Sequence, residues 1–327
     1  MKRSWKLIAV ACVAALALAF GLAACSGSSS KSSSNAKTGL VILYEKDDSL
    51  INNYSLLAVN PDAPFADADG NAVSDVKINT VGAKAFIDWM LSDEGLDLAG
   101  KYGVKEYGEA LFYIKDDAPR AKAEIPKATE ETKTIRLSTT TSVNDSGLLG
   151  AILPTFEEKY GYKVEIYSAG TGKAIANAKM GNADVILVHA KAQEETFISD
   201  GFSYILDGQK AERLNYMYNY FVICGPAADP AGIKAAPNAK DAFKKIADGK
   251  YKFISRGDKS GTHTKEISLW PEGLGITTEQ ESVANYTDWY VYSNAGMGTC
   301  LTMAKEQDGY ILSDKATYLS FAANQSK

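Results

Sequence analysis

One local pattern recurs along this chain and limits the folds open to it. A short run rich in β-branched and aromatic residues ends in a cluster of Gly, Ser and Thr, and each cluster opens a helix-like run. The strand candidates are residues 134–138, 163–167, 251–255 and 289–293. The clusters that follow them are "TTTSVNDSG", "SAGTG", "RGDKSGT" and "NAGMGT". Strands that alternate with helices predict an α/β fold with mixed or parallel sheets, covered by helices on both faces.

The region before residue 134 has a pattern of its own. The apolar runs at 40–45 and 54–61 are typical of strands, and 79–103 has the periodicity of one long helix. Its first residues, Asn79 or Thr80, are suited to cap it. Its apolar stripe consists of Phe86, Trp89 and Met90. Residues 116–133 have few apolar anchors and alternate in charge, so they are expected to form a surface linker.

The N-terminus has the composition of an export signal. A basic start precedes an apolar run that is too short to span a membrane comfortably, so residues 1–24 are expected to be a signal peptide. Leu22–Cys25 resembles a bacterial lipobox, which implies that Cys25 is lipidated and that residues 25–37 form a Ser-rich tether. The expected location is extracytoplasmic, on the cell membrane. The alternative is an ordinary signal with a chance cysteine.

Charge and cysteine content exclude some classes of protein. The whole chain has a net charge of −5, and removing the three positive charges of residues 1–24 leaves −8, which argues against nucleic-acid binding. A small anion remains possible, because a local site can be positive in an acidic protein. Cys224 and Cys300 are left as either a disulfide or two buried thiols. With only His189 and His263 present, a His-rich metal site is excluded, and no cofactor is expected.

The hydroxyl-rich clusters suggest a ligand. A helix N-terminus presents unpaired N–H groups, and several such loops at one sheet edge could surround an oxyanion, which only accepts hydrogen bonds. Arg256 is the natural charged partner, with Asp258 expected to orient it and His263 expected to be an ordinary first-turn helix residue. A simpler interpretation is that each cluster only caps its helix. The "TTT" run exceeds what one cap needs.

Two enzyme classes were tested against the sequence. A nucleotide-binding GxxxxGK[ST] loop would need Gly at 167 and Ser or Thr at 174, where this chain has Tyr167 and Ala174. A serine hydrolase of the G-x-S-x-G type is excluded as well, since that motif does not occur. The sequence therefore specifies no catalytic set, and we do not expect an enzyme.

Taken together, five segments resemble the tungstate-binding proteins of bacterial ABC importers, from about residue 135 to about residue 318. The segments are "TTTSVNDSGLL", "GTGKAIANAKMGNADVILVHA", "YNYFVICGPAADPAGI", "SRGDKSGTHTKE" and "AGMGTCLTMA". The resemblance implies a periplasmic-binding-protein-like fold of type II, with mixed sheets flanked by helices and a ligand cleft between two lobes. It also implies a monomer that passes its anion to a membrane permease.

The order of the segments differs from the family's. Pieces that usually follow the helix near Tyr318 stand here at 40–61 and 82–95, so the chain resembles a circular permutation of the family. Lobe one would then hold 54–218, with the linker 116–133. Lobe two would hold 38–53 plus 219–327. Residues 38 and 320 are expected to be neighbours on lobe two.

The resemblance also implies the ligand residues. They are Thr140, Thr141 and Ser142 in loop one, Thr171 and Gly172 in loop two, and Arg256, Ser260, Gly261 and Thr262 in loop three. Cys300 departs from the small residue usual in the family. Molybdate, sulfate or phosphate remain alternatives to tungstate, and protonated phosphate would need an acceptor such as Asp145 or Asp258. A ligand sensor and an extracellular enzyme on the same fold are the alternatives from other classes.

Overall fold

The computed structural model describes residues 39–325, so the predicted signal peptide, Cys25 and the tether lie outside the described residues. Within them, no helix combines the length and apolar character needed to cross a bilayer. The strands are β1 Leu40–Tyr44, β2 Ile51–Ala58, β3 Tyr113–Ile114, β4 Thr134–Thr140, β5 Lys163–Ala169, β6 Val185–Val188, β7 Leu214–Pro226, β8 Phe253–Ser255, β9 Tyr290–Tyr292 and β10 Ile311–Asp314.

The strands form a mixed sheet, as the sequence predicted. Its main path runs β1-β7-β2-β6-β4-β5, with β3 and β10 also paired to β7. β4 is parallel to both β5 and β6, whereas the pairs made by β2 and β7 are antiparallel. The parallel strands β8 and β9 make a second, two-stranded sheet. The predicted strand starts are confirmed to within a few residues.

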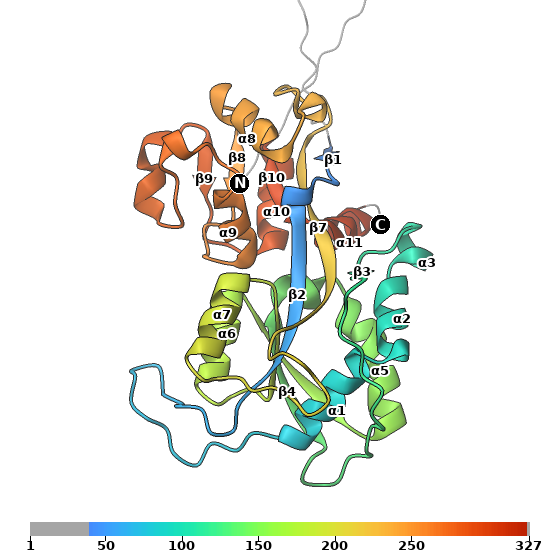
Figure 1. Ribbon diagram of the computed structural model, residues 1–327. Helices are drawn as coiled ribbons and strands as arrows, with labels where there is room; N and C mark the ends of the chain where they lie inside the picture. The colour runs from blue at the N-terminus through green and yellow to red at the C-terminus, as the bar shows by residue number, and fades with distance from the viewer. Residues whose placement is uncertain (1–38, 326–327) are drawn as a thin grey trace, which may run out of the picture. The chain divides into compact units, whose positions relative to one another are not determined.

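The helices fill the segments between strands (Figure 1). They are α1 Thr80–Met90, α2 Asp93–Lys101, α3 Val104–Tyr107, α4 Thr141–Asp145, α5 Leu148–Tyr160, α6 Thr171–Lys179, α7 Lys191–Ser199, α8 Ala239–Asp248, α9 Gly261–Ile267, α10 Met297–Glu306 and α11 Lys315–Gln325. The prediction of one helix over 79–103 is wrong, since α1 and α2 are separate. The Ser92 hydroxyl donates to the Trp89 carbonyl at 2.6 Å and accepts from the Gly95 amide at 3.2 Å, which ends one helix and caps the next.

The long strand β7 links two parts of the sheet. Residues 214–220 pair with β2, whereas 221–226 pair with β1 and β10. β2 and β7 lie side by side over much of their length (Figure 1). The paired strands β2 and β7 therefore connect the part of the sheet that contains β6, β4 and β5 to the part that contains β1 and β10.

The apolar core divides at the same place. Two clusters take their residues from 54–217, apart from Ala316 and Leu319 of α11. Two others take theirs from 40–50 and 221–322. The division therefore falls at residues 51–53 on β2 and 218–220 on β7, where the strands carry polar side chains such as Asn52 and Asn219.

The first described strand, β1, and the last helix, α11, are in contact. The Tyr318 hydroxyl donates to the Leu40 carbonyl at 2.8 Å, and Leu40 and Ile42 pack against the cluster that contains Tyr318. Residues 116–133 contain no helix or strand, as predicted for a linker. The Ala121 and Ala128 amides of this linker donate to the carbonyls of Leu91 and Tyr160, at 3.0 and 2.8 Å.

Candidate functional site

Loop one follows β4, the strand parallel to two neighbours. Two hydroxyls near the end of β4 have structural roles. Ser138 donates to the Ala174 carbonyl at 2.8 Å, and Thr139 donates to the Leu187 carbonyl at 2.7 Å. The next residue, Thr140, is the N-cap of α4 and makes no capping hydrogen bond with its side chain. Its hydroxyl lies 3.0 Å from that of Ser142. The first-turn amides of α4 are thus left without a side-chain cap, as an anion-binding loop requires.

Loop two follows β5 at the same sheet edge, because β4 and β5 are parallel. Gly170 is the N-cap of α6, so this helix also begins without a side-chain cap. Thr171 is fully buried, and its hydroxyl has no hydrogen-bond partner among the described residues. Gly172 and Lys173 are exposed. A buried hydroxyl without a partner costs free energy, which points to a group outside the chain as its acceptor.

Loop three follows β8 and supplies the positive charge. Arg256 is only 5% exposed, its Nη2 pairs with Asp258 Oδ2, and its Nε has no partner among the residues that the structure describes. The predicted orienting role of Asp258 agrees with this ion pair. The Ser260 hydroxyl caps α9 by accepting from the His263 amide at 3.3 Å, which leaves its own hydrogen available to a ligand. His263 lies in the first turn of α9, as expected.

The three loops adjoin one another. A β-carbon placed on Gly170 would lie 3.4 Å from Cβ of Ser260, so loop two contacts loop three. A β-carbon on Gly261 would collide with the imidazole ring of His189, and Nε2 of that ring lies 3.1 Å from the Ser142 hydroxyl of loop one. The structure therefore brings together residues of all three loops, which the sequence predicted as one site.

The electrostatics of this region favour an anion. Arg256 contributes a positively charged guanidinium with several N–H donors. Burial, and second the positive charge of Arg256, lower the pKa of His189 to about 4. Burial also lowers the pKa of His263, with a smaller contribution from Arg256. Both imidazoles are therefore neutral at pH 7, and the Asp258 carboxylate is engaged by Arg256 and by the Ser260 amide. The other groups are amide, hydroxyl and guanidinium donors, which suit a tetrahedral oxyanion.

A polar network that the sequence analysis missed lies behind loop one. The Tyr54 hydroxyl accepts from Asn52 Nδ2 at 2.8 Å, donates to Asp314 Oδ2 at 3.2 Å and lies 3.4 Å from the Ser142 hydroxyl. Asn219 also donates to Asp314, whose pKa burial raises to about 6. Asp314 is the last residue of β10, and His189 is the first residue after β6.

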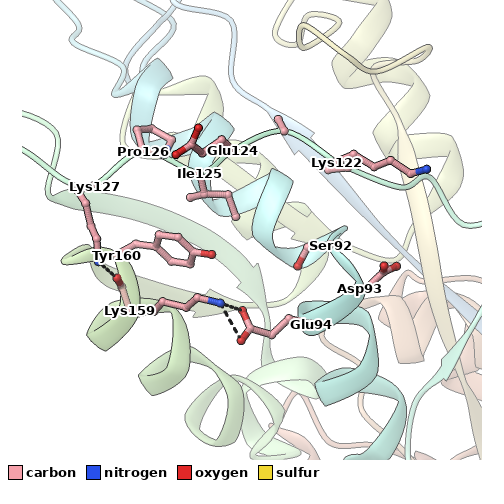
Figure 2. A pocket seen from close by; sticks show the side chains of 12 residues that line it. Ser92, Asp93, Glu94, Lys122, Glu124, Ile125, Pro126, Lys127, Lys159 and Tyr160 are labelled. Carbon is pink, nitrogen blue, oxygen red and sulfur yellow. Dashed lines mark hydrogen bonds and ion pairs between the residues drawn. The ribbon is translucent and has the colours of Figure 1, made fainter.

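A separate groove of about 670 Å³ lies under the linker (Figure 2). Its walls are residues 121–127 of the linker, the start of α2 and the end of α5. In Figure 2 the Lys159 ammonium points to the Glu94 carboxylate, and the two are joined at 3.0 Å. The groove mixes acidic and basic side chains and includes none of the predicted ligand residues.

Cys224 and Cys300, the two cysteines among the described residues, are both buried and free, which settles the alternative left open by the sequence. Cys224 lies on β7 and Cys300 on α10, as predicted. Among the described residues, no group of three or more His, Cys, Asp or Glu side chains has the arrangement of a metal site.

Comparisons with known proteins identify related chains. The chain is 46% identical over 198 residues to the tungstate-binding protein TupA of Peptoclostridium acidaminophilum, covering 60% of this chain and 64% of that one. It is 37% identical over 184 residues to TupA of Campylobacter jejuni, with 56% and 63% covered. A solved structure of the tungstate ABC transporter from Geobacter sulfurreducens is 42% identical, covering 58% and 75%, with a TM-score of 0.47.

The chain thus spans less than two thirds of the length of the curated relatives it matches. The PBP superfamily domain matches residues 126–327, a segment that includes all three loops, α6, β8 and α9. On this match, the chain belongs to the PBP superfamily.

Proposed function

We propose that this protein captures tungstate between two lobes outside the cytoplasm and delivers it to the permease of an ABC importer. The observation that carries the proposal is the meeting of three loops whose buried donors, the Thr171 hydroxyl and Arg256 Nε, have no partner among the described residues. The proposed ligand set is the one expected from the sequence, Thr140, Thr141, Ser142, Thr171, Gly172, Arg256, Ser260, Gly261 and Thr262. The relatives named as tungstate-binding proteins support the choice of anion.

The acceptors near the site favour a fully ionised anion over phosphate. Phosphate carries a proton near neutral pH, so its site needs a free acceptor. Asp145 is exposed, and Asp258 is engaged by Arg256 and by the Ser260 amide at 3.1 Å. Tungstate, molybdate and sulfate carry no proton at this pH and therefore fit the donor-rich loops better.

Calorimetric titration with tungstate, molybdate, sulfate and phosphate tests the proposal. We expect tungstate to bind most tightly, with phosphate the weakest of the four. Binding of tungstate no tighter than sulfate would contradict the proposed ligand. A sensor role would be supported instead if the occupied protein failed to stimulate transport by the permease in reconstituted vesicles. The proposal includes no catalytic step and no resident cofactor.

Two lobes are proposed from the division of the core. Lobe one would comprise 54–218 and lobe two 38–53 plus 219–327, in agreement with the boundaries of the apolar clusters. β2 and β7 would then be the hinge strands. Loops one and two would belong to lobe one and loop three to lobe two, so that an anion held by all three favours closure.

The permuted order is also part of the proposal. It is supported by the contact between Tyr318 and Leu40, which places α11 beside β1. It is further supported by residues 116–133, which connect β3 to β4 without secondary structure. In this arrangement the linker joins what are the two termini in the usual order.

Membrane anchoring through Cys25 completes the proposal. It is supported by the Leu22–Cys25 sequence and by the Ser-rich stretch after it. Replacing Cys25 by Ser should release the protein from the membrane fraction of the cell that produces it. Retention of the Cys25→Ser variant on membranes would contradict lipidation at this residue.

A further inference from the structure

We propose that His189 is a positioning residue, which holds loop one against the start of α9 and thereby slows release of the anion. The inference rests on the proposed function and extends it, because His189 is not part of the proposed ligand set. Its chemistry is a neutral hydrogen-bonding ring that joins two ligand loops from opposite lobes.

The first step is the placement of the ring. His189 follows β6, which is parallel to β4, so it lies at the same sheet edge as loop one. The next amide, that of Ala190, donates to Glu194 Oε1 at 2.7 Å, and Glu194 is itself buried and paired with Arg213. The backbone on which the imidazole stands is thus fixed on both sides, by the β6 ladder and by Glu194.

The second step is the contact with loop one. His189 Nε2 lies 3.1 Å from the Ser142 hydroxyl. The same hydroxyl lies near those of Thr140 and Tyr54, at 3.0 and 3.4 Å. With three protein partners, the Ser142 side chain has little capacity left for an anion, so its backbone amide is the better ligand. Its hydroxyl instead ties loop one to His189.

The third step is the contact with loop three. A β-carbon on Gly261 would lie 2.8 Å from His189 Nδ1, closer than real β-carbons approach a neighbour. Any other residue at 261 would therefore push the ring away. The Tyr54 ring, 5.1 Å from the imidazole between centroids, supports it from behind. The His189 side chain thus touches both Ser142 and Gly261, and an opening motion would have to break one of these contacts.

Protonation state is consistent with this role. Burial and the nearby Arg256 keep the ring neutral, so it adds no charge that would compete for Asp258 or attract a second anion. Loss of the His189 side chain is therefore expected to affect closure after the anion has bound, and so the dissociation rate. The association rate should change little.

Stopped-flow measurement of tungstate association and dissociation tests the inference. We expect His189→Ala to dissociate about tenfold faster while its association rate stays within about threefold of wild type. His189→Gln places an amide near the former Nε2 and should restore most of the lost retention. Thermal unfolding of each ligand-free variant verifies that it is folded. If His189 had a purely structural role, its replacement would lower the midpoint of thermal unfolding without changing the ratio of the association and dissociation rates.

A double-mutant cycle makes the test specific. Gly261→Ala should accelerate dissociation in the wild-type background, because the new methyl group displaces the imidazole. In the His189→Ala background the collision is gone, so the same change should have a much smaller effect. Equal effects in both backgrounds, or an unchanged dissociation rate in His189→Ala, would overturn the inference while leaving the proposed function intact. Failure of the wild-type protein to bind any of the oxyanions would instead refute both.

Discussion

Two nitrogens of the Arg256 guanidinium differ in whether they have a partner. Its Nη2 is held by Asp258, whereas its Nε is buried without a partner among the described residues. An anion that accepts from Nε would satisfy this group, so the guanidinium is held in position before the ligand arrives. Preorganisation of this kind contributes to affinity because little side-chain entropy is lost on binding.

Arg256→Ala should therefore weaken tungstate binding about a hundredfold, or about 2–3 kcal/mol, since a charge-assisted hydrogen bond and the local positive charge are both lost. The ligand-free unfolding midpoint should change little, because the remaining Asp258 carboxylate can reach water. Titration calorimetry and thermal unfolding measure the two quantities. Arg120→Ala is the matched control, since Arg120 is half-exposed and pairs with Asp93 on the surface. Equal affinity in the two variants would assign Arg256 a structural role.

Replacing Thr171 should affect tungstate affinity and ligand-free stability in different directions. Thr171→Val keeps the shape and removes a buried hydroxyl without a partner. Tungstate affinity should fall about tenfold, whereas ligand-free stability should stay equal or rise, because an unsatisfied polar group has been removed.

The control for Thr171 is Thr139→Val, which removes a hydroxyl that donates to the Leu187 carbonyl at 2.7 Å. That variant should lose about 1 kcal/mol of ligand-free stability in urea titrations. If Thr171→Val were destabilised to the same extent, its hydroxyl would have a partner within the protein and the binding role would be wrong.

At the residue scale, the sequence predicted the loops better than the contacts between them. Thr140 ends β4 and Thr171 closely follows β5, and because these parallel strands end at one sheet edge, their convergence could be predicted. Arg256 follows β8 of the second sheet, so its approach to the other two loops depends on packing between the sheets. The approach of His189 to Gly261 could not be predicted either, because it depends on how two parts of the core pack against each other. Local periodicity carries no information about such packing.

At the scale of elements, α9 and β9 are joined by a buried carboxyl group. Glu266 Oε1 accepts from Trp270 Nε1 at 3.0 Å and from the Tyr290 hydroxyl at 2.6 Å. Burial raises the pKa of Glu266 to about 7. The folded protein thus holds a proton that the unfolded chain releases near pH 4.5, and folding stability should fall as the pH rises from about 4.5 to 7.

Glu266→Gln should remove this component of the pH dependence, because the amide oxygen keeps both hydrogen bonds and does not titrate. Urea unfolding of both proteins between pH 4.5 and 8 measures it. Relative to the variant, wild type should lose up to about 1.4 kcal/mol per pH unit within the interval from pH 4.5 to 7. Parallel pH profiles for the two proteins would show that Glu266 does not hold the proton.

The break between α1 and α2 shows what hydrophobic periodicity does not predict. The apolar stripe of Phe86, Trp89 and Met90 is buried as predicted, and Asn79 caps α1 by accepting from the Gly82 amide at 2.8 Å. The break at 91–92 was not predicted, because it depends on the Ser92 hydroxyl turning back to the Trp89 carbonyl. A serine in a helical pattern fits both outcomes.

At the scale of the whole molecule, the proposed permutation predicts that the chain can be returned to the usual order. A gene encoding residues 126–325, a flexible Gly-Ser spacer and then residues 39–118 should give a folded protein, because Tyr318 of α11 already contacts Leu40 and the new ends lie in the linker. Circular dichroism and tungstate titration should match the original chain within about threefold in affinity.

The matched control is a second rearranged chain, in which the same two ends are joined but the new termini lie within β7, between Phe221 and Val222. Both of these residues are buried in the sheet. That protein should fail to fold. Similar folding of both rearranged chains, or of neither, would contradict the view that the linker marks the original ends of the domain.

The most direct test of the central claim is an anomalous difference map, recorded at a tungsten absorption edge from crystals grown with tungstate. A single strong peak is expected where loops one, two and three meet, in contact with the Arg256 guanidinium and the Thr171 hydroxyl. A peak in the groove beside Lys122, Lys127 and Lys159, or no peak at saturating tungstate, would contradict the account.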